Sequence, residues 1–177
     1  MKMNIYPIKR FILFGGNLEL FNFAEYIIKR NYELYIFTEE LHLLEKINAI
    51  GTLKENLDKE SISYTSLKKL SVEELKPFIT TETIGVSLSA LWIFKKDVID
   101  LFNNRLFNLH GSRLPKERGG GGYSWQILSQ NRLGGLSIHR LEEGIDTGNI
   151  VLYKEILFPP SCPVSYTHLT LPTKRRV

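Results

Sequence analysis

The chain has 177 residues, of which 43% are hydrophobic and 24% are charged. These proportions are ordinary for a soluble globular domain, and the length is enough to bury a proper core. No apolar run reaches the roughly 18 residues of a membrane span, and the N-terminus lacks a signal-peptide core. The single cysteine, Cys162, excludes an internal disulfide and fits a reducing compartment, so we expect a cytoplasmic protein.

The formal net charge of +4 does not indicate a nucleic-acid-binding module. Three of the positive charges lie at the extreme C-terminus, on Lys174, Arg175 and Arg176, and without them the body carries +1. We find no basic stripe with interleaved aromatic residues, which a folded nucleic-acid-binding surface needs. A tRNA partner stays open, because a domain outside this chain could bind it.

The N-terminal part alternates strand-like and helix-like segments. Short apolar runs predict strands at residues 10–14 and 33–37, and apolar residues at helical spacing predict helices at residues 18–30 and 39–49. Such βαβ alternation is typical of an α/β fold with a doubly wound, mostly parallel sheet of Rossmann type. The first strand ends at Gly15-Gly16-Asn17, which lacks the third glycine of a dinucleotide fingerprint, so a tight turn is favoured over a phosphate site and no nicotinamide cofactor is expected.

The later elements follow from the same patterns. We predict a weak strand at residues 62–65, a helix that starts at the capping box Ser71 to Glu74, a central strand at 83–89, a helix at 95–102, strands at 105–109 and 136–141, and an antiparallel return strand at 148–158. A further helix is expected after the four glycines that end at Gly122. Both His139, in its strand, and His42, on a surface helix, are interpreted as satisfied structural histidines.

Three polar residues suit acyl transfer to an amine. Asn108 and His110 end one predicted strand, two residues apart and therefore on one face, and Asp146 lies in an acidic loop with two glycines. An amide donor and an imidazolium can stabilise a developing oxyanion, and a carboxylate can orient the imidazolium and accept the proton of the amine. The competing interpretation is a chance Asn-x-His pair and an ordinary turn-forming aspartate.

The residues around these three positions resemble the N10-formyltetrahydrofolate-dependent formyltransferase family, whose pattern is Asn-x-His-x-Ser-Leu-Leu-Pro followed by Asp-x-Gly. The matching segments are Asn108 to Pro115 and Gly144 to Gly148, with Asp146 36 residues after His110. The resemblance implies that Asn108, His110 and Asp146 are catalytic and that N10-formyltetrahydrofolate is the formyl donor. Arg113 in place of the usual leucine, and four consecutive glycines in place of a proline-bearing loop, leave the acceptor open.

The resemblance also implies the binding residues. The walls of a pterin site are expected at Trp92, Ile93, Phe94, Glu142, Glu143, Gly144 and Ile145. Trp92 and Phe94 could equally be core aromatics. The acceptor is expected at Ser112, Arg118, Gly119, Gly120, Gly121, Gly122 and Tyr123, although the glycines could also form a flexible connector. No metal is expected, because candidate ligands are not grouped at zinc-like spacing.

The leading functional hypothesis is formyl transfer to a primary amine of a nucleotide-linked amino sugar. The alternative acceptor is methionyl-tRNA, and an alternative of another class is an inactive, truncated binding fragment. A homodimer is possible for a full-length protein. These acceptor preferences rest on analogy within the family.

The last residues do not continue the pattern of the chain. We expect a formyltransferase catalytic domain at residues 1–163, incomplete at its C-terminal end, and a non-native tail at residues 164–177 that resembles translated adapter sequence. Such a tail should be mobile, and an apolar patch should be exposed where a covering helix is missing. The competing interpretation is a native arm whose basic residues bind phosphate; a large loss of stability or affinity on deleting residues 164–177 would support that arm.

Overall fold

The computed structural model describes residues 7–120, 128 and 132–157. The chain divides into two compact units, Met1–Asn108 and Leu109–Val177, and each is described by itself. The predicted tail, Cys162 and the helix predicted after Gly122, apart from its last residue Leu128, lie outside the described residues.

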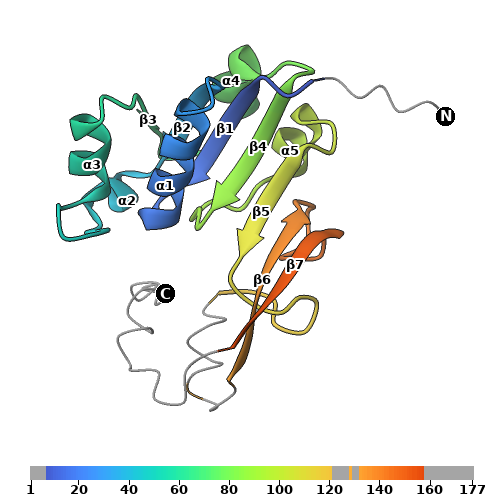
Figure 1. Cartoon of the computed structure of the whole chain (residues 1–177). Helices are drawn as coiled ribbons and strands as arrows, with labels where there is room; N and C mark the ends of the chain where they lie inside the picture. The colour runs from blue at the N-terminus through green and yellow to red at the C-terminus, as the bar shows by residue number, and fades with distance from the viewer. Residues whose placement is uncertain (1–6, 121–127, 129–131, 158–177) are drawn as a thin grey trace. The chain divides into compact units, whose positions relative to one another are not determined.

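The first unit is built on parallel strands in the order β3-β2-β1-β4-β5. β1 pairs in parallel with both β2 and β4, so that Leu13 lies beside Ile36 on one side and Val86 on the other. Strand β5 carries the chain from the first unit into the second (Figure 1). The strands are β1 (Arg10–Gly15), β2 (Glu33–Thr38), β3 (Thr65–Ser66), β4 (Thr83–Leu88) and β5 (Leu106–His110).

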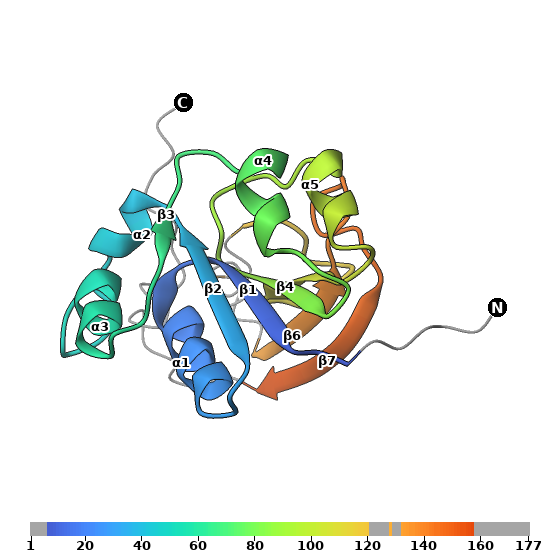
Figure 2. The ribbon, with the colours of Figure 1, turned by 90° about the horizontal axis from the view of Figure 1, so that it is seen from above.

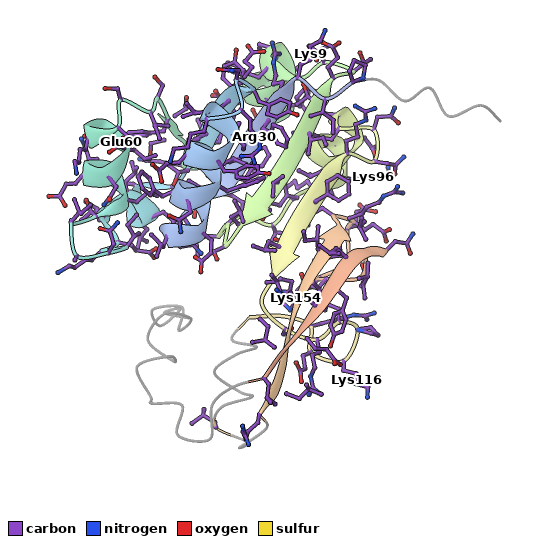
Figure 3. All side chains as sticks on the ribbon, viewed as in Figure 1. Lys9, Arg30, Glu60, Lys96, Lys116 and Lys154 are labelled. Carbon is purple, nitrogen blue, oxygen red and sulfur yellow. The ribbon has the colours of Figure 1, made fainter. Side chains whose placement is uncertain are left out.

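Helices cover both faces of this sheet. Figure 2 shows α1 (Asn17–Ile28) on one side of the strands, and α4 (Val72–Leu75) and α5 (Lys96–Leu101) on the other. The side chains of β1 accordingly have no exposed surface from Ile12 to Phe14, which is typical of a central parallel strand. Charged side chains such as Arg30 and Glu60 lie on the outside of this unit (Figure 3). The prediction of a doubly wound, mostly parallel sheet is confirmed.

The segment after β2 differs from the prediction of one helix at residues 39–49. It forms the short helix α2 (Glu40–Leu44), and a separate helix, α3 (Leu53–Lys59), follows. A capping box starts α3, because Thr52 Oγ1 accepts from the backbone N–H of Glu55 at 3.2 Å and Glu55 Oε2 accepts from the backbone N–H of Thr52 at 2.7 Å. This Thr-x-x-Glu signal is local and was present in the sequence. A single-turn 3₁₀ helix, η1 (Lys76–Phe78), follows α4.

His42 lies inside the first unit, as its interpretation as a structural histidine implies. It is only 3% exposed, because α2 turns its ring onto the turn that follows β1. A Cβ atom on Gly16 would lie 2.3 Å from His42 Cγ, so only glycine allows the ring to pack there. The ring therefore has a structural role, and its Nδ1 lies 3.0 Å from Glu45 Oε2.

The second unit contains an antiparallel hairpin. β6 (Leu133–Arg140) pairs with β7 (Ile150–Leu157), and the register shifts between Ile138 and His139. The predicted return strand is confirmed, and β6 starts three residues earlier than predicted. Most of β7 is exposed, including the apolar side chains of Val151, Leu152 and Leu157. Across the residues that the structure describes, no helix combines the length and the hydropathy needed to cross a bilayer.

Candidate functional site

Asp146 is the centre of a polar cluster in the second unit. It lies in the loop from β6 to β7 with a left-handed φ of 51°. The backbone N–H of Gly119 donates to Asp146 Oδ2 at 2.9 Å. His110 Nδ1 lies 3.5 Å from Asp146 Oδ2, and His139 Nε2 lies 3.3 Å from Asp146 Oδ1. One carboxylate thus connects the end of β5, the glycine loop and β6.

The cluster is largely shielded from solvent. The side chains of His110 and Asp146 are 12% and 11% exposed, and that of His139 is 1% exposed. Burial by itself raises the pKa of Asp146, but the hydrogen bond from His139, the N–H of Gly119 and the proximity of His110 together lower this pKa below its ordinary value. Asp146 is therefore an ionised acceptor held in a partly dry setting.

The ring of His110 is fixed at both nitrogens. Its Nε2 lies 2.9 Å from the backbone carbonyl oxygen of Glu117, and its Nδ1 faces Asp146. A carbonyl oxygen only accepts, so Nε2 carries a hydrogen in this arrangement, and the doubly protonated imidazolium is the form that donates to both oxygens. The ring also packs edge-on against His139, with centroids 6.2 Å apart.

A compact loop after β5 supports His110. Arg113 and Glu117 form an ion pair with Nη2 2.6 Å from Oε1, and the backbone N–H of Arg113 donates to Glu117 Oε2 at 3.0 Å. The hydroxyl of Ser112 donates to the same Glu117 carbonyl that faces His110, and Ser137 Oγ donates to the carbonyl of Ser112 at 2.9 Å. Arg113, the departure from the family pattern, therefore closes this loop.

His139 and Glu117 are the members of the cluster that sequence reasoning did not select as functional. His139 is fully buried, as expected of a structural histidine, but its Nε2 is directed to the predicted catalytic carboxylate and its Nδ1 lies 2.8 Å from the carbonyl of Arg140. One signal in the sequence could have marked His139: it lies two residues after Ser137, so both side chains point to the same face of a strand that leads into the Asp146 loop. Nothing in the sequence around Glu117 marked it.

The other predicted site residues fall in different settings. Asn108 lies on β5, two residues before His110 and at the end of the first unit. Ser112 is fully buried, so its hydroxyl serves the loop that holds His110. Arg118 and Gly120 are exposed. The residues Gly121, Gly122 and Tyr123 lie outside the described part of the chain.

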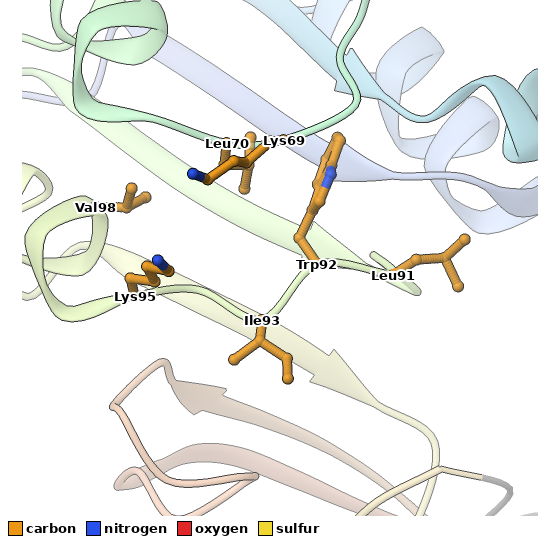
Figure 4. A pocket seen from close by; sticks show the side chains of 7 residues that line it. All are labelled: Lys69, Leu70, Leu91, Trp92, Ile93, Lys95 and Val98. Atoms are coloured by element: carbon orange, nitrogen blue, oxygen red, sulfur yellow. The ribbon is translucent and has the colours of Figure 1, made fainter. Parts of the chain in front are cut away.

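Of the residues predicted to bind pterin, Trp92, Ile93 and Phe94 belong to the first unit and residues 142–145 to the second. Phe94 is 6% exposed and packs edge-on against Phe14 with centroids 5.2 Å apart, so its side chain belongs to the core, as the competing interpretation held. Trp92 is half-buried and lines a pocket, and Ile93 is 71% exposed (Figure 4). In the second unit the residues Glu142, Glu143, Gly144 and Ile145 are all exposed.

Gly148 is required by the geometry of the Asp146 loop. A Cβ atom at this position would lie 1.9 Å from the backbone oxygen of Arg140, so any other residue must displace the chain. We expect Gly148→Ala to lower the free energy of unfolding by about 1–3 kcal/mol and to reduce any activity that depends on Asp146. Urea unfolding followed by circular dichroism measures the first effect.

Gly120→Ala is the matched control for this prediction. A Cβ atom on Gly120 has no heavy atom within 4 Å among the described residues, and its exposed position allows the substitution. Equal stability of the two variants would contradict the close approach of Gly148 to Arg140.

No group of three or more His, Cys, Asp or Glu side chains within the described ranges is arranged to hold a metal ion. The chemistry of the Asp146 cluster is that of hydrogen-bond donors and one carboxylate acceptor.

The sequence model of the formyl transferase family matches residues 67–164, which include Asn108, His110 and Asp146. The chain is 32% identical over 117 residues to methionyl-tRNA formyltransferase of Clostridium tetani, an alignment that covers 66% of this chain and 34% of that protein. The chain thus spans about a third of the length of that curated relative.

Solved structures share the fold. Phosphoribosylglycinamide formyltransferase from Bacillus halodurans superposes with a TM-score of 0.70 at 18% identity, over 90% of this chain and 86% of that one. The N-formyltransferase from Helicobacter canadensis, in complex with folinic acid and dTDP-3-aminofucose, superposes with a TM-score of 0.68 at 24% identity, over 92% and 58%. With a family match over more than half of its residues, the chain belongs to the formyl transferase family.

Proposed function

We propose that this chain carries the catalytic part of an enzyme that transfers a formyl group from N10-formyltetrahydrofolate to a primary amine of a nucleotide-linked amino sugar. The observation that carries the proposal is the ionised Asp146, which Gly119 and His139 hold beside His110. Asp146 and His110 fall on positions that the family resemblance assigns to catalysis, within the segment that the family model matches.

The groups present suit each step of such a transfer. The amine nitrogen forms a bond to the formyl carbon, the bond from that carbon to N10 of the folate breaks, and the amine loses a proton while N10 gains one. Asn108 supplies a donor for the oxygen that becomes negative, and the imidazolium of His110 donates to it when Nε2–H exchanges its contact with the Glu117 carbonyl for the substrate. Asp146, with its lowered pKa, accepts the amine proton directly or through water.

The proposal has two versions, which differ in the molecule that accepts the formyl group. The body of the chain carries little net charge, and surface cations such as Lys54 and Lys96 are paired with Asp58 and Asp100. This charge balance favours a small acceptor over a polyanion such as tRNA. Methionyl-tRNA is the second candidate, because the curated relative from Clostridium tetani is a methionyl-tRNA formyltransferase.

The deciding experiment incubates the chain with 10-formyltetrahydrofolate and either a panel of dTDP-linked amino sugars or methionyl-tRNA. Mass spectrometry then detects a product that is heavier by one formyl group. Formylation of a sugar supports the first version, and formylation of methionyl-tRNA alone replaces it by the second. Binding of 5-formyltetrahydrofolate without any transfer would point to the inactive fragment.

Removal of divalent metals should leave this activity unchanged. The proposed steps use only side-chain donors and a carboxylate, so turnover with and without EDTA is expected to agree within experimental error. Loss of turnover in EDTA with recovery on addition of zinc would show that a metal takes part. The measurement is an initial rate at saturating donor.

A further inference from the structure

One nitrogen of His110 is covered by the loop that follows β5. His110 Nε2 lies 2.9 Å from the backbone carbonyl oxygen of Glu117, and the hydroxyl of Ser112 donates to the same oxygen. The other ring nitrogen, Nδ1, faces Asp146 at 3.5 Å. Both nitrogens of the imidazole therefore have partners within the chain, and a reacting oxygen can accept from Nε2–H only after the Glu117 carbonyl has moved away.

Glu117 is held in turn by several contacts with Arg113. Its Oε1 accepts from Arg113 Nη2 at 2.6 Å and from Nε at 3.2 Å, and its Oε2 accepts from the backbone N–H of Arg113 at 3.0 Å. The backbone N–H of Glu117 donates to the carbonyl oxygen of Arg113 at 3.0 Å. Charge-assisted contacts of this kind are stronger than neutral hydrogen bonds. The position of the Glu117 carbonyl, and with it the cover on His110, therefore depends on Arg113.

The hairpin of β6 and β7 makes room for the side chain of Arg113. A Cβ atom on Gly135 would lie 2.7 Å from Arg113 Cγ and 3.0 Å from Tyr153 Cε2, so the arginine stem and the tyrosine ring occupy the space above this glycine. The side chains of Arg113 and Glu117 are 22% and 23% exposed, which shields their ion pair from most of the solvent. The leucine of the family pattern could not form this ion pair, so the arrangement depends on the arginine of this chain.

We propose that Arg113 and Glu117 are positioning residues that keep Nε2 of His110 covered until a ligand enters the site. Their ion pair holds the Glu117 carbonyl against the imidazole, and the oxygen of the reacting group takes the place of this carbonyl when transfer begins. The inference rests on the proposed function, because it takes His110 to be a donor to that oxygen. Weakening the Arg113–Glu117 pair should therefore make Nε2 of His110 more accessible.

Chemical modification measures the cover on His110 without any substrate. Diethyl pyrocarbonate acylates accessible imidazole nitrogens, and His110 and His139 fall in separate tryptic peptides, residues 106–113 and 133–140 of the unmodified chain. Arg113→Leu in the 177-residue chain is expected to raise the modification rate of His110 about three- to fivefold, the size of effect that follows the weakening of one hydrogen bond. His139 has no exposed surface, and its rate should stay unchanged.

Further variants sharpen this comparison. Glu117→Gln should act like Arg113→Leu, because it removes the other charge of the pair and keeps the size of the side chain. Arg113→Lys retains a cation but loses the guanidinium, so its rate should lie between those of Arg113→Leu and the unmodified chain. Lys116→Leu is the matched control, because it removes a positive charge from an exposed position of the same loop and should leave the rate at His110 unchanged.

A kinetic measurement separates this role from simple support of the loop. Because the Glu117 carbonyl competes with the reacting oxygen for Nε2–H, Arg113→Leu should raise kcat/KM about three- to fivefold with the acceptor that the unmodified chain formylates. A pair that only supports the loop would instead lower kcat/KM together with the melting temperature. Circular dichroism gives the melting temperature of each variant.

The outcomes distinguish this inference from the proposed function. Unchanged modification of His110 in both Arg113→Leu and Glu117→Gln, or an equal rise at His139, would overturn the inference, and so would a fall in kcat/KM in Arg113→Leu. If the unmodified chain formylates no acceptor, the proposed function fails, whereas the modification rates still decide whether the Arg113–Glu117 pair covers His110.

Discussion

Replacing Asp146 by asparagine is expected to lower turnover by on the order of 10²-fold or more. Asparagine has nearly the same shape and can still accept from the N–H of Gly119, but it cannot take a proton from the amine. It also removes the negative charge that faces His110 at 3.5 Å and His139 at 3.3 Å. The measurement is kcat under saturating donor and acceptor, with the acceptor that the unmodified chain formylates.

The companion variants Asn108→Ala and His110→Ala should lose turnover to a similar extent, because each removes a donor to the reacting oxygen. All three variants should melt within a few degrees of the unmodified chain, since the affected side chains lie at the edge of the core. Full turnover of Asp146→Asn would show that this carboxylate is not the proton acceptor.

Replacing His139 by asparagine is expected to have the second largest effect, about a tenfold fall in kcat/KM near neutral pH. Asparagine can retain the contact that Nδ1 makes with the carbonyl of Arg140, but it is too short to reach Asp146 in place of Nε2. Loss of a charge-assisted hydrogen bond contributes an effect of this order.

The pH profile distinguishes this positioning role from simple structural damage. Burial raises the pKa of Asp146, and the hydrogen bond from His139 is the largest of the effects that lower it. Without that bond the pKa of Asp146 rises, so the carboxylate becomes protonated at higher pH. The acidic limb of the kcat/KM profile should therefore move to higher pH in His139→Asn. Glutamine at this position can extend its amide toward Asp146, and His139→Gln should restore part of the shift.

The free energy of unfolding should also depend on the ionisation of Asp146. The folded-state pKa of Asp146 is below its ordinary value, so this residue stabilises the fold above the unfolded-state pKa, and that contribution is lost as the pH falls through the folded-state pKa. Urea unfolding over the acidic range should show a smaller pH dependence in Asp146→Asn than in the unmodified chain.

The kcat/KM profile of His139→Asn tests the positioning role of His139. If the acidic limb of this profile does not shift, His139 acts only as a core residue.

Local pattern was enough to predict most of the regular structure. The strands at residues 10–14 and 33–37 were found because continuous apolar runs of this length form buried parallel strands, and the structure extends each by one residue. The division of residues 39–49 and 53–59 into two helices was missed, although Thr52 and Glu55 carried a capping box. The helical pattern of residues 39–49 was read as one helix, whereas a capping box marks only the residue at which a helix begins.

The sequence by itself determined the α/β alternation, because strand period depends only on neighbours along the chain. Its resemblance to the formyltransferase family marked Asn108, His110 and Asp146 as the candidate catalytic residues. Only the tertiary structure decided that His42 is buried against Gly16, that Arg113 pairs with Glu117 to close the loop behind His110, and that His139 holds Asp146. Most of these contacts join residues from different strands, helices or loops, and packing of the whole domain, not local propensity, sets which of them meet. A strand pattern can show that a histidine points inward, but it cannot show which carboxylate lies there.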